Sequence, residues 1–99
     1  MFYTVRGHNK SVFAEKEYRA GLFYYRLKAY DSAIIYFRAV AADYGESEWA
    51  PQALVKLVEA YRHIKYKEEI TETCAHLRQY YPRAQGLSEV CPPADSPAS

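Results

Sequence analysis

Three histidines, two cysteines and two adjacent glutamates are the residues whose types allow metal binding, nucleophilic chemistry or acid–base chemistry. The histidines have no metal-ligand spacing among themselves: they are His8, His63 and His76. Cys74 and His76 are two positions apart, so on a helix their side chains point about 200° apart and do not form a nucleophile–base pair. Glu68 and Glu69 diverge in the same way, and no glycine-rich phosphate loop is present. The pattern predicts a protein without catalytic residues, metal or cofactor.

Charge and hydropathy exclude further classes of protein. Thirteen Lys and Arg against 12 Asp and Glu give a net charge of +1, with no basic stripe for nucleic acid. No stretch reaches the roughly 20 apolar residues of a membrane-spanning helix. A hydrophobic content of 49% excludes disorder for most of the chain. We expect Cys74 in the core, whereas Cys91 is able to form a disulfide in an oxidising compartment, with no partner indicated.

Apolar residues recur with helical spacing in four segments between residues 11 and 82. Ser11, Asp31 and Ser47 are candidate N-caps, Pro51 suits a first helical turn, and Pro82 follows the last helix. The fold class predicted is all-α, with a lead-in at residues 1–10. Residues 83–99 contain three prolines and no apolar period, and they predict a flexible tail.

Self-comparison at an offset of 36 residues aligns two helical hairpins, at about 11–46 and 47–82. The aligned pairs include Tyr25 with Tyr61 and Arg26 with Arg62. The first hairpin resembles a tetratricopeptide repeat, in which small residues let two helices cross closely and aromatic residues fill the space around the crossing. The matching residues are Ala20, Gly21, Tyr24, Ala33 and Phe37. The second hairpin departs at the corresponding positions, which are Leu57, Ala60, Glu69 and Thr73.

A longer pattern carries a more specific resemblance. Residues 15–37 read EKEYxxGxFYYRxxAYxxAIxxF, a YGES turn follows at 44–47, and residues 53–62 read ALxxLVEAYR. Over residues 11–82 the chain resembles the last two repeats of the BamD family, the tetratricopeptide lipoproteins of the outer-membrane β-barrel assembly machinery. The resemblance implies a non-enzymatic scaffold on the periplasmic face of the outer membrane. The implied partners are the periplasmic domains of the barrel insertase and neighbouring assembly lipoproteins.

The chain departs from this family in length. Family members are about twice as long, with a signal peptide, a lipobox cysteine and about five repeats. The chain is therefore expected to be a C-terminal fragment of such a protein, a truncated form of it or the product of a degenerate gene. Two repeats are fewer than the roughly three that bury a continuous core. We therefore expect exposed apolar repeat ends that favour contact with a neighbouring repeat, self-association or a partner helix. A cytoplasmic tetratricopeptide adaptor that binds a peptide in its concave groove is the alternative function.

The resemblance places the binding groove along the first helix of each hairpin. Tyr and Arg are the types most enriched at binding hot spots, which favours the two Tyr-Arg pairs. In the alternative interpretation, Tyr25 and Tyr61 pack between the repeats, while the arginines are solvated or form salt bridges. The predicted partner-binding residues are Tyr18, Leu22, Tyr25, Arg26, Leu54, Val58, Tyr61 and Arg62.

Overall fold

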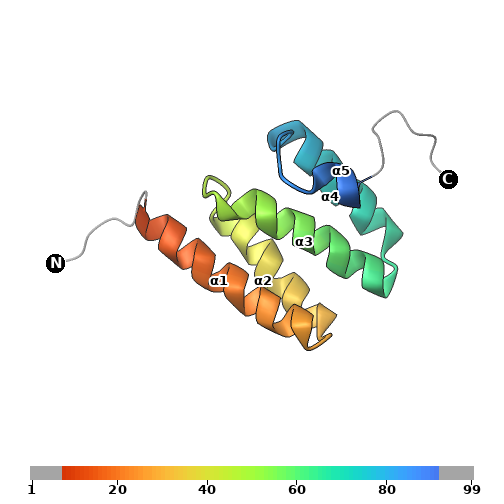
Figure 1. Cartoon of the computed structure of the whole chain (residues 1–99), viewed down its shortest axis with the longest axis horizontal. Coiled ribbons are helices and arrows are strands. Elements are labelled where there is room, and N and C mark those ends of the chain that lie inside the picture. Colours follow the sequence, from red (N-terminus) through yellow and green to blue (C-terminus); the bar gives the residue numbers. More distant parts are fainter. Residues whose placement is uncertain (1–7, 92–99) are drawn as a thin grey trace.

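The computed structural model describes residues 8–91, and this part of the chain contains five helices and no strand (Figure 1). The helices are α1 (His8–Arg26), α2 (Tyr30–Asp43), α3 (Trp49–Ile64), α4 (Lys67–Tyr80) and α5 (Leu87–Val90). The all-α prediction is confirmed. α1 begins before the expected boundary at residue 11, while residues 1–7 and 92–99 lie outside the described residues.

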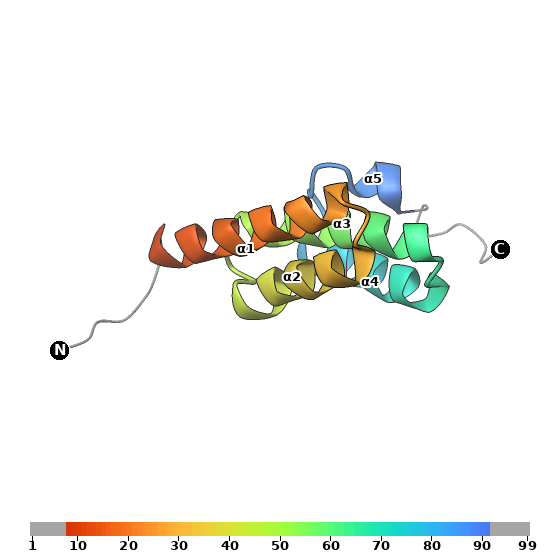
Figure 2. The ribbon, with the colours of Figure 1, turned by 90° about the horizontal axis from the view of Figure 1, so that it is seen from below.

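The four long helices form two hairpins in two layers. α1 pairs with α2, α3 packs against both of them, and α4 packs against α3. In the view of Figure 2, α1 and α3 lie in one layer and α2 and α4 in the other. The first helices of the two hairpins are therefore neighbours, as the tetratricopeptide resemblance predicts.

The crossing of α1 and α2 depends on Gly21. A Cβ atom at this position would lie 2.6 Å from Cε1 of Phe37, which is closer than real side chains approach. Phe37 and Ala33 are fully buried, and Tyr24 stacks on Tyr36 with ring centroids 5.5 Å apart. The predicted roles of Gly21, Ala33 and Phe37 at this crossing are confirmed, whereas Tyr24 is only half-buried.

A residue in the left-handed backbone conformation follows the first helix of each hairpin. Lys28 and Lys65 have φ angles of 64° and 65°, which end a helix and turn the chain. α2 begins at Tyr30, and its N-cap position is held by Ala29 without a side-chain hydrogen bond, so Asp31 lies in the first turn instead of capping it. Ser47 does act near a helix start, because its Oγ accepts a 3.3 Å hydrogen bond from the amide of Trp49.

Hydrogen bonds in the hairpin turns set the repeat at 37 residues. In the first hairpin the amide of Ala29 donates to the carbonyl of Tyr24, and in the second the amide of Tyr66 donates to the carbonyl of Tyr61. The two left-handed lysines have the same separation. The offset of 36 from the sequence comparison is therefore one residue short.

This register corrects the comparison of the two hairpins. The second hairpin keeps the tyrosine of the repeat pattern, and it replaces the crossing glycine and phenylalanine with other buried residues. The equivalent pairs are Gly21 and Val58, Tyr24 and Tyr61, Ala33 and Ile70, and Phe37 and Cys74. Consequently Tyr25 is equivalent to Arg62, and the two Tyr-Arg pairs do not occupy equivalent positions.

A third unit begins after α4. The amide of Ser47 donates to the carbonyl of Tyr44 before α3, and the amide of Ala84 donates to the carbonyl of Tyr81 before α5, again 37 residues apart. α5 therefore corresponds to the first turn of α3, and it contacts α3 and α4 as α3 contacts α1 and α2. The structure differs here from the flexible tail expected from residue 83, because residues 83–91 continue the repeat.

A disulfide joins this last turn to α4. Cys74 and Cys91 are bonded, with Cα atoms 5.7 Å apart, and both are buried. Their equivalents one unit earlier are Phe37 and Leu54, which belong to the same apolar core. The disulfide thus takes the place that apolar side chains hold between the first two units.

Candidate interaction surface

The predicted partner-binding residues divide into a buried and an accessible group. Tyr18, Leu54, Val58 and Tyr61 are between 0% and 8% exposed and belong to the core. Because they lie in the core rather than in the groove between α1 and α3, they hold the hairpins together. Of the four, Leu54 also lines a pocket formed with α2 and α4. This corrects the prediction for these four residues.

The accessible group lies at the C-terminal ends of α1 and α3. Leu22 and Tyr25 are half-buried, and Arg26 and Arg62 are exposed. Tyr25 lies between the repeats, as the alternative interpretation held. Arg62 is partly engaged, since its Nη1 donates a long 3.5 Å hydrogen bond to the carbonyl of Val90 in α5.

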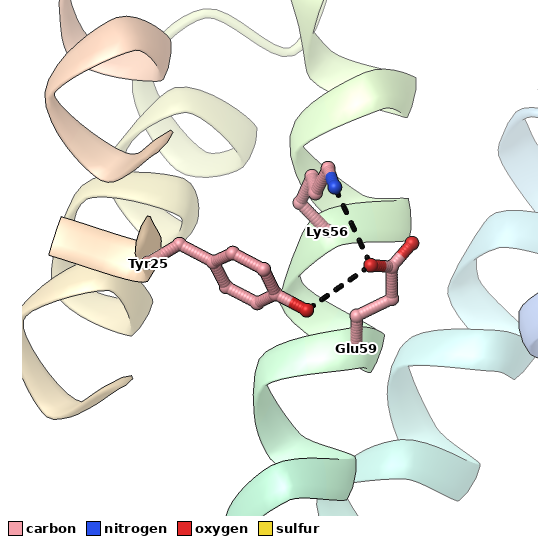
Figure 3. Close-up of polar contacts among 3 residues, drawn as sticks. All are labelled: Tyr25, Lys56 and Glu59. Atoms are coloured by element: carbon pink, nitrogen blue, oxygen red, sulfur yellow. Dashed lines mark hydrogen bonds and ion pairs between the residues drawn. The ribbon is translucent and has the colours of Figure 1, made fainter. Parts of the chain in front are cut away.

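A polar cluster joins α1 to α3 across the groove (Figure 3). The hydroxyl of Tyr25 donates to Oε1 of Glu59 at 3.2 Å, and Nζ of Lys56 lies 3.4 Å from the same oxygen. Nζ of Lys56 is also 5.0 Å from the centre of the Tyr25 ring, within cation–π range. One carboxylate oxygen of Glu59 therefore contacts the side chain of Tyr25 from α1 and that of Lys56 from α3.

Burial and the negative charge of Glu59 raise the pKa values of two tyrosines beside this groove. Burial first, and then the charge and hydrogen bond of Glu59, raise the pKa of Tyr25 to about 12. Burial also raises the pKa of Tyr18, with a smaller increase from Glu59 that Arg26 opposes. Both hydroxyls stay protonated at neutral pH, so they act as hydrogen-bond donors and not as bases.

Next to the cluster is a pocket of about 350 Å³ lined by Tyr25, Glu59, Arg62 and His63. The His63 ring stacks on Tyr30 at 4.4 Å and meets the edge of Tyr25 at 5.7 Å. The pocket therefore offers aromatic faces, one carboxylate and one guanidinium, which suits a polar segment of another protein.

Sequence reasoning missed Lys56, Glu59 and His63. Their spacing of three and four residues places them on one face of α3, and that periodicity was available in the sequence. This spacing does not indicate which helix the face packs against. The packing of α1 against α3 in the structure brings this face opposite Tyr25.

Residues 8–91 contain no group of three or more His, Cys, Asp or Glu side chains placed to hold a metal ion. Both cysteines in this range are in the disulfide. Within the same range, no helix has the length and apolar character needed to cross a membrane.

Comparison with known proteins assigns the chain to a family. Residues 8–77, which include both hairpins except the end of α4, match the family described as YfiO, outer membrane lipoprotein. No curated protein and no solved structure matches the chain significantly.

Proposed function

The chain belongs to the YfiO family of outer membrane lipoproteins, and from this membership we propose that it is a non-enzymatic protein–protein interaction scaffold. Its role would be that of the C-terminal repeats of BamD in outer-membrane β-barrel protein assembly. The partners proposed are the periplasmic domains of the barrel insertase and neighbouring assembly lipoproteins. The observation that carries the proposal is a family match that spans α1 to α3 and most of α4.

The groove between α1 and α3 supports this role. Arg26 and Arg62 are exposed beside the half-buried Tyr25, and Tyr and Arg dominate protein-binding hot spots. The Tyr25–Glu59 hydrogen bond fixes the ring before a partner arrives. A side chain that is already ordered loses less conformational entropy on binding.

The disulfide supports a location on the periplasmic face of the outer membrane. Disulfides persist in oxidising compartments such as the bacterial periplasm and are rare in the cytosol. Cys74 and Cys91 are both buried in their bond, which disfavours the alternative of a cytoplasmic peptide-binding adaptor.

Calorimetric titration with the insertase's periplasmic domains tests the proposal. We would compare the oxidised native chain, the double variant Arg26→Ala and Arg62→Ala, and the control Arg19→Ala. Arg19 is a matched control because it is an exposed arginine on α1 that pairs with Glu15 at 2.7 Å, away from the pocket. We expect micromolar binding by the native chain and the control, with affinity reduced about tenfold or more in the double variant.

Two other outcomes have definite meanings. Binding that all three proteins share equally would keep the scaffold and place its contact on another face, such as the pocket between α2 and α4 that includes Arg38, Glu72 and His76. No binding by a chain with native helical content would contradict the proposed partner.

A further inference from the structure

Large apolar side chains are exposed along one side of α1. Phe13, Phe23 and Leu27 are 44%, 55% and 60% exposed, although they recur at helical spacing. Lys16 and Ala20 fall between them on the same face, and Tyr24 borders it. α1 lies at the outer edge of the array (Figure 1). We call these residues the open α1 face: Phe13, Lys16, Ala20, Phe23, Tyr24 and Leu27.

The repeat register shows what kind of surface this is. Each residue of the open α1 face has an equivalent on α3, 37 positions later, and α3 packs there against α2. Five of the equivalents are buried and the last is half-buried: they are Ala50, Ala53, Leu57, Ala60, Tyr61 and Ile64. The open α1 face is therefore a helix-packing surface whose helix is not provided by residues 8–91.

At the other end of the array, α5 already takes the place where a next unit would begin. This short helix occupies the position of the first turn of the next unit's first helix, and the Cys74–Cys91 bond holds it there. A second copy that stacked head-to-tail would need to place its α1 in this position. Open-ended stacking is thus blocked, and an association of two copies has to bring the same face of each together.

The open α1 face is self-complementary about Ala20. In an antiparallel pair of α1 helices with a two-fold axis at Ala20, residues equally far before and after it are opposed. Phe13 then meets Leu27 of the second copy, Lys16 meets the ring of Tyr24 in a cation–π pairing, and Phe23 lies opposite Glu17 at the edge of the face. The small side chain of Ala20 stands at the centre, where the helix axes approach most closely.

We propose that the chain forms a two-fold symmetric homodimer through the open α1 face. Burial of Phe13, Phe23 and Leu27 in both copies supplies the apolar area that drives association. The occupant of this surface is α1 of the second copy. This inference does not depend on the partner proposed above, because the pocket at Tyr25 and Arg62 is formed with α3.

Sedimentation equilibrium over a range of concentrations tests the proposal on the full oxidised chain. We expect the native chain to show a monomer–dimer equilibrium and Phe23→Glu to raise the dissociation constant about tenfold or more. The matched control is Tyr80→Glu, a similarly exposed aromatic side chain on α4, which does not touch α1. Circular dichroism verifies that each variant keeps its helices.

Cross-linking tests how the two α1 helices are aligned in the dimer. With an Ala20→Cys variant, mild oxidation should join two copies through the new thiol, while the native pair remains in its own disulfide. Phe13→Cys should not join to itself, because the two-fold axis places its copies far apart. A native chain that stays monomeric, a dimer that Phe23→Glu leaves intact, or an Ala20→Cys variant that does not cross-link would each overturn the proposal.

Discussion

Tyr25 is the residue at which burial, charge and packing act together. Its ring lies between α1 and α3, where it meets Tyr30 and His63 edge to face at 5.5 and 5.7 Å. Its hydroxyl donates to Glu59. A tyrosine with these contacts is held in one orientation, and the energy of that arrangement depends on keeping the hydroxyl proton.

Alkaline pH is therefore expected to destabilise the fold. The folded-state pKa of Tyr25, about 12, lies above its ordinary value of 10, so the stability it contributes is fully present below pH 10 and is lost as the pH rises through about 12. Tyr25→Phe removes this ionisation, so the melting temperature of the variant should fall less steeply over that interval. Thermal melts at a series of alkaline pH values measure the difference.

Glu59→Gln is the companion variant for this prediction. It removes the negative charge that helps raise the pKa of Tyr25, so the last part of the tyrosinate titration, to which Tyr25 contributes, should shift to lower pH than in the native protein. An unchanged titration in Glu59→Gln, or an unchanged alkaline slope in Tyr25→Phe, would mean that the Tyr25–Glu59 contact has no influence on stability.

Substitution of Gly21 gives a second prediction at the scale of one residue. Gly21→Ala places a methyl group against the buried ring of Phe37, and overpacking of this kind costs about 1 to 3 kcal/mol. The higher helix propensity of alanine offsets about 1 kcal/mol. We expect a net loss of unfolding free energy, measured by chemical denaturation.

A double-mutant cycle separates the clash from other effects. Phe37→Leu shortens the side chain that Gly21→Ala meets, so the two changes combined should destabilise less than the sum of the single changes. Simple additivity would show that the ring is not what excludes a side chain at position 21.

At the scale of elements, α5 is the helix that cannot be stable by itself. It has four residues, and helices shorter than about 12 residues are marginal in water. Its position rests on the Cys74–Cys91 bond, on the hydrogen bond from Arg62 to Val90, and on packing of this segment against α3. The covalent bond is the strongest of these constraints.

Cys91→Ser should accordingly release α5 while α1 to α4 stay folded. The bond joins residues 17 positions apart, and a loop of about this length corresponds to about 3 kcal/mol in the chain-entropy estimate. We expect a lower melting temperature and rapid amide exchange in residues 87–91, with the helical signal nearly unchanged. Protection at these amides equal to that of the native protein would show that packing alone holds α5.

The four long helices were predictable because each carries an apolar face with a 3.6-residue period. The repeat length was not, because tyrosines follow one another at Tyr24 and Tyr25 and at Tyr80 and Tyr81, so an alignment shifted by one residue still pairs aromatics. Turn hydrogen bonds, which the sequence does not display, decide between 36 and 37. α5 was missed because its single turn lies among prolines and has no period to detect.

The candidate interaction surface was predicted in part for a related reason. Helical spacing groups Tyr18, Leu54, Val58 and Tyr61 with accessible residues on the first helix of each hairpin, yet these four face the neighbouring helices. Which side of a helix becomes buried depends on the crossing geometry that Gly21 and Phe37 create. That Arg26, Arg62 and Tyr25 bind a partner stays a prediction, and their polar neighbours on α3 became visible only in the folded structure.

The whole molecule is an array with two unlike ends. At one end of the described residues a short turn is joined to α4 by a disulfide, and at the other end α1 exposes Phe13, Phe23 and Leu27. Two hairpins give a small core, so the melting temperature is sensitive to anything that binds only the folded state. A dimer through the open α1 face would be such a stabilising influence.

Thermal stability should therefore depend on protein concentration. If the native state is the dimer, a tenfold increase in concentration stabilises each chain by about 0.7 kcal/mol, which raises the melting temperature of a domain of this size by about 4 °C. Phe23→Glu should melt at a temperature independent of concentration, and Tyr80→Glu should keep the native dependence, because its exposed side chain lies on α4. Calorimetric scans of the three proteins at several concentrations measure this. A native melting temperature that does not change with concentration would contradict the dimer. It would mean that the monomer is stable with the open α1 face exposed to water, through its two hairpins and the disulfide.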